Sequence, residues 1–311
     1  MSGREAVLLG EMPSLSKLYL NAAAVAARSR VLGSGSVKTL PEAVHEVRGV
    51  RADAEKLTAF QHLLGLPARD WMPAGFVHVL GFPLAVSVMS REDFPLPLLG
   101  MIHLRNRVEQ FRPVHYTRDL TLRSWADNVQ GHRVGTQADL VVEVRDGTGG
   151  ELLWRGVSTY LARGVFLPGV DKPAPRREPD DFSPPDPTAL WRLGPGTGRD
   201  YAAVSGDFNP IHLSTLTARA LGMRGMLAHG MYLASRALGE ALPNDERSFT
   251  WDVDFGAPVF LPSTVALHFA DAEDASGSWV RSDYAAWNAR TGRKHFSGSV
   301  LPLGPGSGST E

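Results

Sequence analysis

Hydrophobic residues dominate two stretches at corresponding places in the two halves of the chain. One apolar run covers 77–84 and the other 228–234, each with a histidine at its second position. Where the second run continues to Leu242, only Arg236 and Glu240 are charged. Each run predicts a helix enclosed by other elements, because a helix at the surface would keep a broad polar face.

Alternating apolar and polar positions after each run predict several β-strands, each with one face turned to the helix. The residues expected on that face are Leu120, Leu122, Trp125, Val265, Leu267 and Phe269. The order of landmarks also repeats, since Val108 precedes Pro113 by the interval at which Val253 precedes Pro258. Such duplication predicts two copies of one unit, each a helix inside a curved antiparallel sheet, which is an α+β fold.

A proline-rich stretch separates the two copies. We therefore expect an N-terminal repeat, a proline-rich linker, a C-terminal repeat and a low-complexity tail. Their predicted ranges are 1–165, 166–189, 190–303 and 304–311.

Composition excludes several classes of protein. With 311 residues, 43% hydrophobic and 21% charged, the chain is long enough for one large domain or two ordinary ones. The formal net charge of −1 gives no reason to expect nucleic acid or an anionic membrane as partner. The absence of cysteine excludes disulfides, thiolate metal sites and a cysteine nucleophile, and it fits a cytoplasmic location. Glu11, Pro13 and Lys17 interrupt the first apolar stretch, so we expect neither a signal peptide nor a membrane span there.

The densest group of chemically useful side chains lies in the second half. Asp207, Asn209 and His212 fall within six residues that Gly206 and Pro210 interrupt, which predicts a shaped loop. A Gly-Asp-x-Asn-Pro segment alone is most often a turn whose Asp and Asn satisfy the backbone. The ten histidines of the chain are scattered and no His-Glu-x-x-His pattern occurs, so we expect no metal and no cofactor.

Further residues turn this loop into a specific pattern. The segment 201–218 reads Tyr-x-x-x-Ser-Gly-Asp-x-Asn-Pro-Ile-His-x5-Ala, and 228–231 reads Ala-His-Gly-Met. This pattern resembles the hydratase motif of the MaoC-like (R)-specific enoyl-thioester hydratases, a hot-dog family. The resemblance is strong over 190–303 and reaches the first half only as a degenerate copy. It implies a double hot-dog fold and a hydro-lyase that interconverts trans-2-enoyl and (3R)-3-hydroxyacyl thioesters.

The resemblance also implies roles for individual residues. Asp207 and His212 would form the catalytic pair, and the backbone N–H of Gly230 would bind the thioester oxygen. The chemistry itself needs such groups, because hydration moves one proton at water and another at C2 while negative charge grows on the thioester oxygen. The residues expected to support or line the substrate site are Tyr201, Ser205, Asn209, His229 and Met231. Core packing or helix capping is the plainer interpretation of Tyr201, His229 and Met231.

The first half departs from the motif. Leu66 stands where Asp207 would be, Val79 replaces Gly230, and the loop before the helix is shorter. Pro83 is expected to interrupt the first helix. We therefore expect one active site, in the C-terminal repeat. The apolar residues of the first repeat either line a groove for the acyl chain beside Gly81 and Ala85 or pack as an ordinary core.

Two other functions stay open from the sequence. Hot-dog proteins also include acyl-thioesterases, and a non-catalytic acyl-thioester-binding protein is a third possibility. The substrate implied is an acyl-CoA or an acyl-carrier-protein thioester of fatty-acid or related lipid metabolism, and a homodimer of double hot-dog chains is possible. The basic residues considered for contact with a carrier are Arg219, Arg224, Arg281, Arg293 and Lys294.

Overall fold

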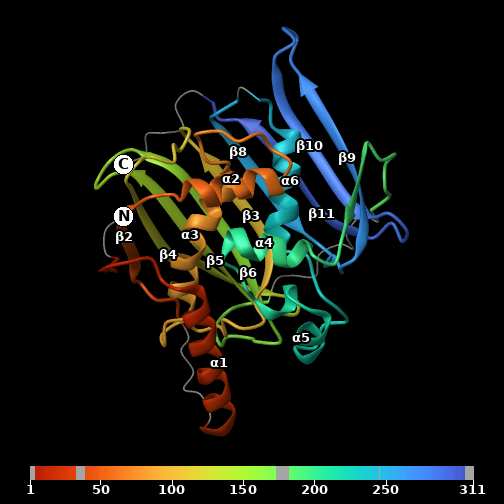
Figure 1. Ribbon diagram of the computed structural model, residues 1–311. Helices are drawn as coiled ribbons and strands as arrows, with labels where there is room; N and C mark the ends of the chain where they lie inside the picture. Colours follow the sequence, from red (N-terminus) through yellow and green to blue (C-terminus); the bar gives the residue numbers. More distant parts are fainter. Residues whose placement is uncertain (1–3, 33–38, 173–181, 245, 305–311) are drawn as a thin grey trace. The chain divides into compact units, whose positions relative to one another are not determined.

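The computed structural model describes residues 4–32, 39–172, 182–244 and 246–304, and it divides the chain into two compact units (Figure 1). Each unit is assembled from separate stretches of chain. Unit 1 comprises Met1–Arg51, His78–Asn106 and Thr117–Arg177, and unit 2 comprises Ala52–Val77, Arg107–Tyr116 and Glu178–Glu311. The ranges given above for the sequence repeats stay predictions.

Unit 1 contains a sheet in the order β1-β2-β4-β5-β6 and most of helix α3. Strands β1 and β2 pair in parallel, and the other neighbours in this series pair antiparallel. The elements are β1 (Ala6–Leu8), α1 (Leu15–Leu32), β2 (Val44–Val50), α3 (Ala74–Met89), β4 (Leu120–His132), β5 (Gly135–Asp146) and β6 (Leu152–Arg163); β3 (Ile102–Gln110) falls partly in each unit.

Helix α3 packs on the sheet of unit 1 at Gly81. A Cβ added to Gly81 would lie 2.6 Å from Cγ1 of Val142 on β5, so Gly81 faces the sheet. This contact contradicts the expectation that Gly81 lines an open groove. The expected interruption at Pro83 is also wrong, because α3 runs without a break from Ala74 to Met89.

The expected orientation of Trp125 is wrong as well. Val142 pairs with Ser124, so the even-numbered side chains of β4, including Leu122, lie on the face that α3 covers. Trp125 is at an odd position and therefore lies on the opposite face, because side chains alternate along a strand. There it packs with Val44, Val141 and Val157, and the guanidinium of Arg4 lies over its ring at 5.5 Å.

Unit 2 contains a second sheet, in the order β8-β11-β10-β9-β7, in which all neighbouring strands pair antiparallel. Its elements are α2 (Ala54–Leu63), β7 (Ala189–Leu193), α4 (Thr197–Ser205), the 3-10 helix η1 (Pro210–His212), α5 (Thr215–Ala220), α6 (Gly230–Ala241), β8 (Phe249–Phe255), β9 (Ser263–Glu273), β10 (Trp279–Asn288) and β11 (Lys294–Pro302).

Helix α6 lies on the sheet of unit 2, in contact with β8, β10 and β11 (Figure 1). Most of its residues are buried on all sides, as the apolar run predicts. Val265 and Leu267 of β9 are fully buried, which fits the inward face expected for them. Unit 2 also takes in α2 from the first half, whose Phe60 lies 6.1 Å from Tyr201 of α4 between ring centroids.

Of the described part of the predicted linker, residues 166–172 belong to unit 1 and residues 182–189 to unit 2. The Phe182 ring packs on Trp287 at 6.0 Å, and the carbonyl of Asp186 accepts a hydrogen bond from Nδ1 of His268. Residues 173–181 of the predicted linker and 305–311 of the predicted tail lie outside the described residues. Among the helices in the described part of the chain, none has the length and apolar character needed to cross a membrane.

Candidate active site

The loop between α4 and η1 is held by a series of backbone-to-side-chain hydrogen bonds. Gly206 ends α4 in the left-handed conformation, with φ of 74°, which turns the chain toward Asp207. The Asp207 N–H donates to Oγ of Ser205 at 3.2 Å, and the Asn209 N–H donates to Oδ1 of Asp207 at 3.2 Å. Asn209 then caps η1, accepting from the Ile211 N–H at 3.4 Å. The motif residues thus fix the Asp207 carboxylate on the loop.

His212 ends η1, and its Nδ1 lies 2.9 Å from the carbonyl oxygen of Leu227. Because a carbonyl oxygen only accepts, this Nδ1 carries the ring proton. Burial lowers the pKa of His212 below its ordinary value, although Asp207 and the Leu227 carbonyl both act to raise it. The neutral ring therefore presents a lone pair at Nε2, as a general base requires.

His229 occupies the N-cap position of α6 and lies against both catalytic candidates. Its Nε2 donates to the carbonyl oxygen of Asp207 at 3.0 Å and lies 3.8 Å from Oδ2 of the same residue. Its ring stacks on that of His212, with centroids 3.7 Å apart and planes at 25°. Burial, together with the neighbouring His212, holds the pKa of His229 well below its ordinary value.

Gly230 is the first residue of α6. Leu233 donates the first hydrogen bond of this helix turn to the carbonyl of His229, so the amide of Gly230 lies ahead of the helical hydrogen-bond series. A Cβ added to Gly230 would lie 3.1 Å from the ring of Phe255. The helix start thus offers a backbone N–H at the positive end of the helix dipole, on a residue where any side chain would require the Phe255 ring to shift.

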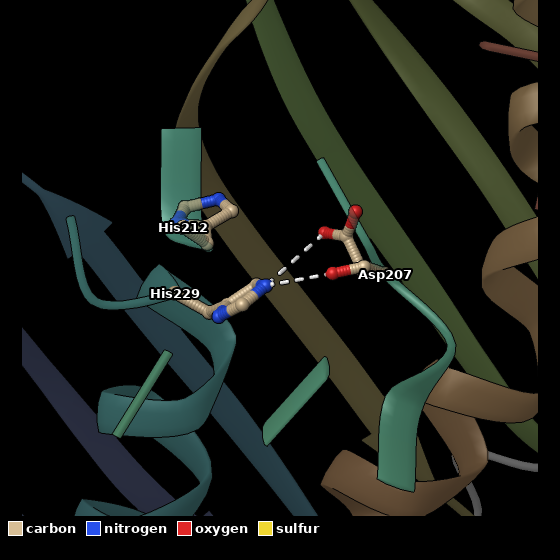
Figure 2. Close-up of side chains that lie close together, drawn as sticks. All are labelled: Asp207, His212 and His229. Atoms are coloured by element: carbon tan, nitrogen blue, oxygen red, sulfur yellow. Dashed lines mark hydrogen bonds and ion pairs between the residues drawn. The ribbon is translucent and has the colours of Figure 1, made fainter. Parts of the chain in front are cut away.

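Figure 2 shows Asp207, His212 and His229 gathered at one place, with the two imidazoles facing the carboxylate residue across a short gap. Each offers a ligand atom, and the three atoms lie within 4.8 Å of one another. A carboxylate and two imidazoles can hold a divalent cation. The ring protons already point at backbone carbonyls, however, and the remaining nitrogen of His229 is buried. The absence of a metal from the working protein stays a prediction.

The remaining predicted site residues fall into two groups. Ser205 and Asn209 are half-buried in the loop itself, whereas Tyr201 and Met231 are buried. The Tyr201 ring lies 4.8 Å from that of His229, behind the catalytic loop. Their role as substrate-binding residues stays a prediction.

The sequence did not predict three groups that contact the site residues, because none of them belongs to a motif. The carbonyl of Leu227 sets the tautomer of His212, and no sequence pattern marks a backbone acceptor. Phe255 limits the space at Gly230, and Phe60 packs on Tyr201 from the other half of the chain. Phe60 lies five residues before Gly65, as Tyr201 lies five residues before Gly206, and this repeated spacing is a sequence signal for that contact.

Of the basic residues considered for carrier contact, Arg219 and Arg224 are exposed. Arg219 donates from Nε to the carbonyl of Arg224 at 3.4 Å, and the Arg224 guanidinium lies 4.8 Å from the Phe260 ring. Arg281, in contrast, is bound to Asp283.

Comparison with known proteins places the chain in a family. Residues 172–285 match the model of the MaoC-like domain. The 3-hydroxyacyl-thioester dehydratase X of Mycobacterium tuberculosis is 32% identical over 265 residues, which cover 85% of this chain and 91% of that protein.

Solved structures agree with this relationship. The crystal structure of HtdX of Mycobacterium tuberculosis matches with a TM-score of 0.69 and 30% identity, covering 84% of this chain and 100% of that one. A MaoC-like dehydratase matches with a TM-score of 0.63 over 84% of this chain and 98% of the other, and its 16% identity speaks for the fold alone. The α+β double hot-dog fold is thereby confirmed, and the chain belongs to the MaoC-like dehydratase family.

Proposed function

We propose that this protein is a hydro-lyase that dehydrates (3R)-3-hydroxyacyl thioesters of fatty-acid or related lipid metabolism and hydrates trans-2-enoyl thioesters in reverse. One observation carries the proposal: a carboxylate, a neutral imidazole with a fixed tautomer and a helix-start amide converge within a single loop and helix junction. The name of the Mycobacterium tuberculosis relative points to the same chemistry.

In the dehydration direction the pair formed by Asp207 and His212 handles two protons. One member removes a proton from C2, and the C–H electron pair moves into the new C2–C3 double bond as the C3–O bond breaks. The proton taken from C2 passes through the pair to the departing hydroxyl, which leaves as water and returns Asp207 to a carboxylate and His212 to a neutral imidazole. Negative charge that builds on the thioester oxygen is stabilised by the N–H of Gly230. Hydration reverses these steps.

The lowered pKa of His212 predicts the pH dependence of the reaction. His212 must be neutral to act as a base, and its pKa lies below the ordinary histidine value because the ring is buried. We expect kcat/KM for hydration to be constant above that pKa and to fall as the pH drops through it. A decline that began well above the ordinary histidine pKa would contradict the role of His212.

A direct assay separates the three candidate functions. Hydratase activity removes the ultraviolet absorbance of an enoyl thioester without releasing thiol, whereas a thioesterase releases thiol and a binding protein does neither. Solved thioesterases share the fold at 11–12% identity, and no observation at this site favours their reaction.

Site variants then test the assignment of residues. We expect Asp207→Asn and His212→Gln each to lower kcat by roughly 10²–10⁴-fold without loss of fold, the usual contribution of a positioned acid or base. Asp200→Asn, on the exposed side of α4, is the matched control and should keep full activity. Hydration retained in either site variant would refute the assignment.

The finer details belong to the same proposal. The R stereochemistry, the use of CoA or of a carrier protein, a homodimer and a cytoplasmic location are predictions of the sequence. A series of enoyl chain lengths on both carriers tests the substrate.

A further inference from the structure

We propose that His229 is a positioning residue, which locks the loop that carries Asp207 onto the start of α6 and supports the ring of His212 without touching the substrate. The inference rests on the proposed function, since it concerns how that site is held in its working geometry.

Burial separates His229 from the groups that must meet a substrate. His229 is 4% exposed, whereas Asp207, His212 and Gly230 are half-buried. A substrate that reaches the three half-buried groups therefore approaches from the side that His229 does not face. This arrangement argues against the substrate-binding role that the motif suggests for His229.

The hydrogen bond from His229 links two separate parts of the site. Its Nε2–H donates to the backbone carbonyl of Asp207 at 3.0 Å, so it holds the main chain of the loop rather than only the carboxylate. His229 is also the residue directly before Gly230 and caps the same helix. One side chain thus fixes the distance between the catalytic loop and the amide that is to bind the thioester oxygen.

Ring packing fixes the orientation of His212 from the same side. The two imidazoles stack with centroids 3.7 Å apart, and the Tyr201 ring lies 4.8 Å from that of His229. His212 is held at its Nδ1 by Leu227 and at its face by His229, which leaves one ring orientation. A displacement of about 1 Å among reacting groups can cost about 10²-fold in rate, so loosening this support should reduce turnover.

Three substitutions at His229 separate the hydrogen bond from the packing. His229→Phe keeps a stacked ring but has no donor. His229→Gln places an amide N–H the same number of bonds from the backbone as Nε2, and His229→Asn places one at the position of Nδ1, which does not reach Asp207. The matched control is His295→Phe, which removes a comparable bond from a buried imidazole to the carbonyl of Ala257 in the same unit.

We expect His229→Phe and His229→Asn to lower kcat by about 10²-fold while KM on an enoyl-CoA stays within about threefold. His229→Gln should regain at least tenfold of that loss, and His295→Phe should keep kcat and KM within about twofold. The acid limb of kcat/KM should stay at the same pH in His229→Gln as in the wild-type protein. Circular dichroism verifies the fold of each variant.

Several outcomes would overturn the inference. A raised KM with unchanged kcat would make His229 a substrate contact, and a shifted acid limb would make it a titrating catalytic group. Equal activity of the Gln and Asn variants would show that the bond to Asp207 has no role, even if the Phe variant fails to fold. Failure of the proposed function looks different, because the wild-type protein would then leave enoyl thioesters unchanged.

Discussion

Stability in mild acid should depend on His78, a buried histidine near the start of α3 that the proposed chemistry does not use. Its ring stacks on Phe82 at 5.8 Å and on His103 at 6.2 Å between centroids. His78 is 8% exposed, and burial lowers its pKa to about 4 from an ordinary value of 6.5. The unfolded chain therefore binds a proton here at pH values where the folded protein does not.

The sign and size of the effect follow from that difference. A histidine whose folded pKa is lowered contributes full stability above pH 6.5, and the contribution is lost as the pH falls below that value. Between pH 7 and pH 5 the folded ring stays almost unprotonated while the unfolded one becomes almost fully protonated. His78 alone should then remove about 2 kcal/mol from the free energy of unfolding over this interval.

Urea unfolding at pH 7, 6 and 5 measures the effect in wild type and in His78→Phe. We expect the variant to lose about 2 kcal/mol less than wild type between pH 7 and pH 5, whatever its stability at pH 7. Phe82→Leu is the control, because it disturbs the same packing without removing a titrating group. A slope of stability against pH that is the same in His78→Phe and in wild type would refute the reasoning.

Three further predictions concern close packing and metal. Gly230→Val places a side chain against the Phe255 ring, which an added Cβ already approaches at 3.1 Å, and so displaces the amide that is to bind the thioester oxygen; kcat/KM should fall by roughly 10²-fold, and full activity would show that close packing on Phe255 does not position this amide. Gly75→Ala puts a Cβ 2.6 Å from that of Ser235 and should lower the free energy of unfolding by about 1–3 kcal/mol, and Ser235→Gly in the same chain should restore it. Denaturant titration measures both variants, and a Gly75→Ala protein as stable as wild type would contradict the prediction. Exhaustive treatment with a chelator should leave turnover unchanged, and activity that is lost and then restored by a divalent cation would mean that the acid–imidazole cluster holds a metal.

Local pattern was enough to predict the main elements. The enclosed helix over Gly230–Ala241 and the inward positions Val265 and Leu267 follow from the spacing of apolar residues, which directly reflects what each element buries. The loop around Asp207 was equally readable, because its hydrogen bonds run between residues two positions apart. The family and the hot-dog fold followed from that one motif.

The sequence did not predict how residues far apart in the chain pack on one another. The pattern places Trp125 on the wrong face, because it lies an odd number of positions from Leu122 and strand side chains alternate between faces. Gly81 faces Val142 rather than a groove. Pro83 was expected to break a helix that tertiary packing keeps continuous.

By itself the sequence predicted a set of candidate catalytic residues and a repeated order of elements, and it indicated the family to which the chain belongs. Only the tertiary structure decided how those residues act on one another. The tautomer of His212 depends on the carbonyl of Leu227, 15 residues away, and the stacking of His229 depends on the path of the loop between them. The physical reason is that proton position and pKa are set by burial and by neighbours in space, which no local pattern of residues records.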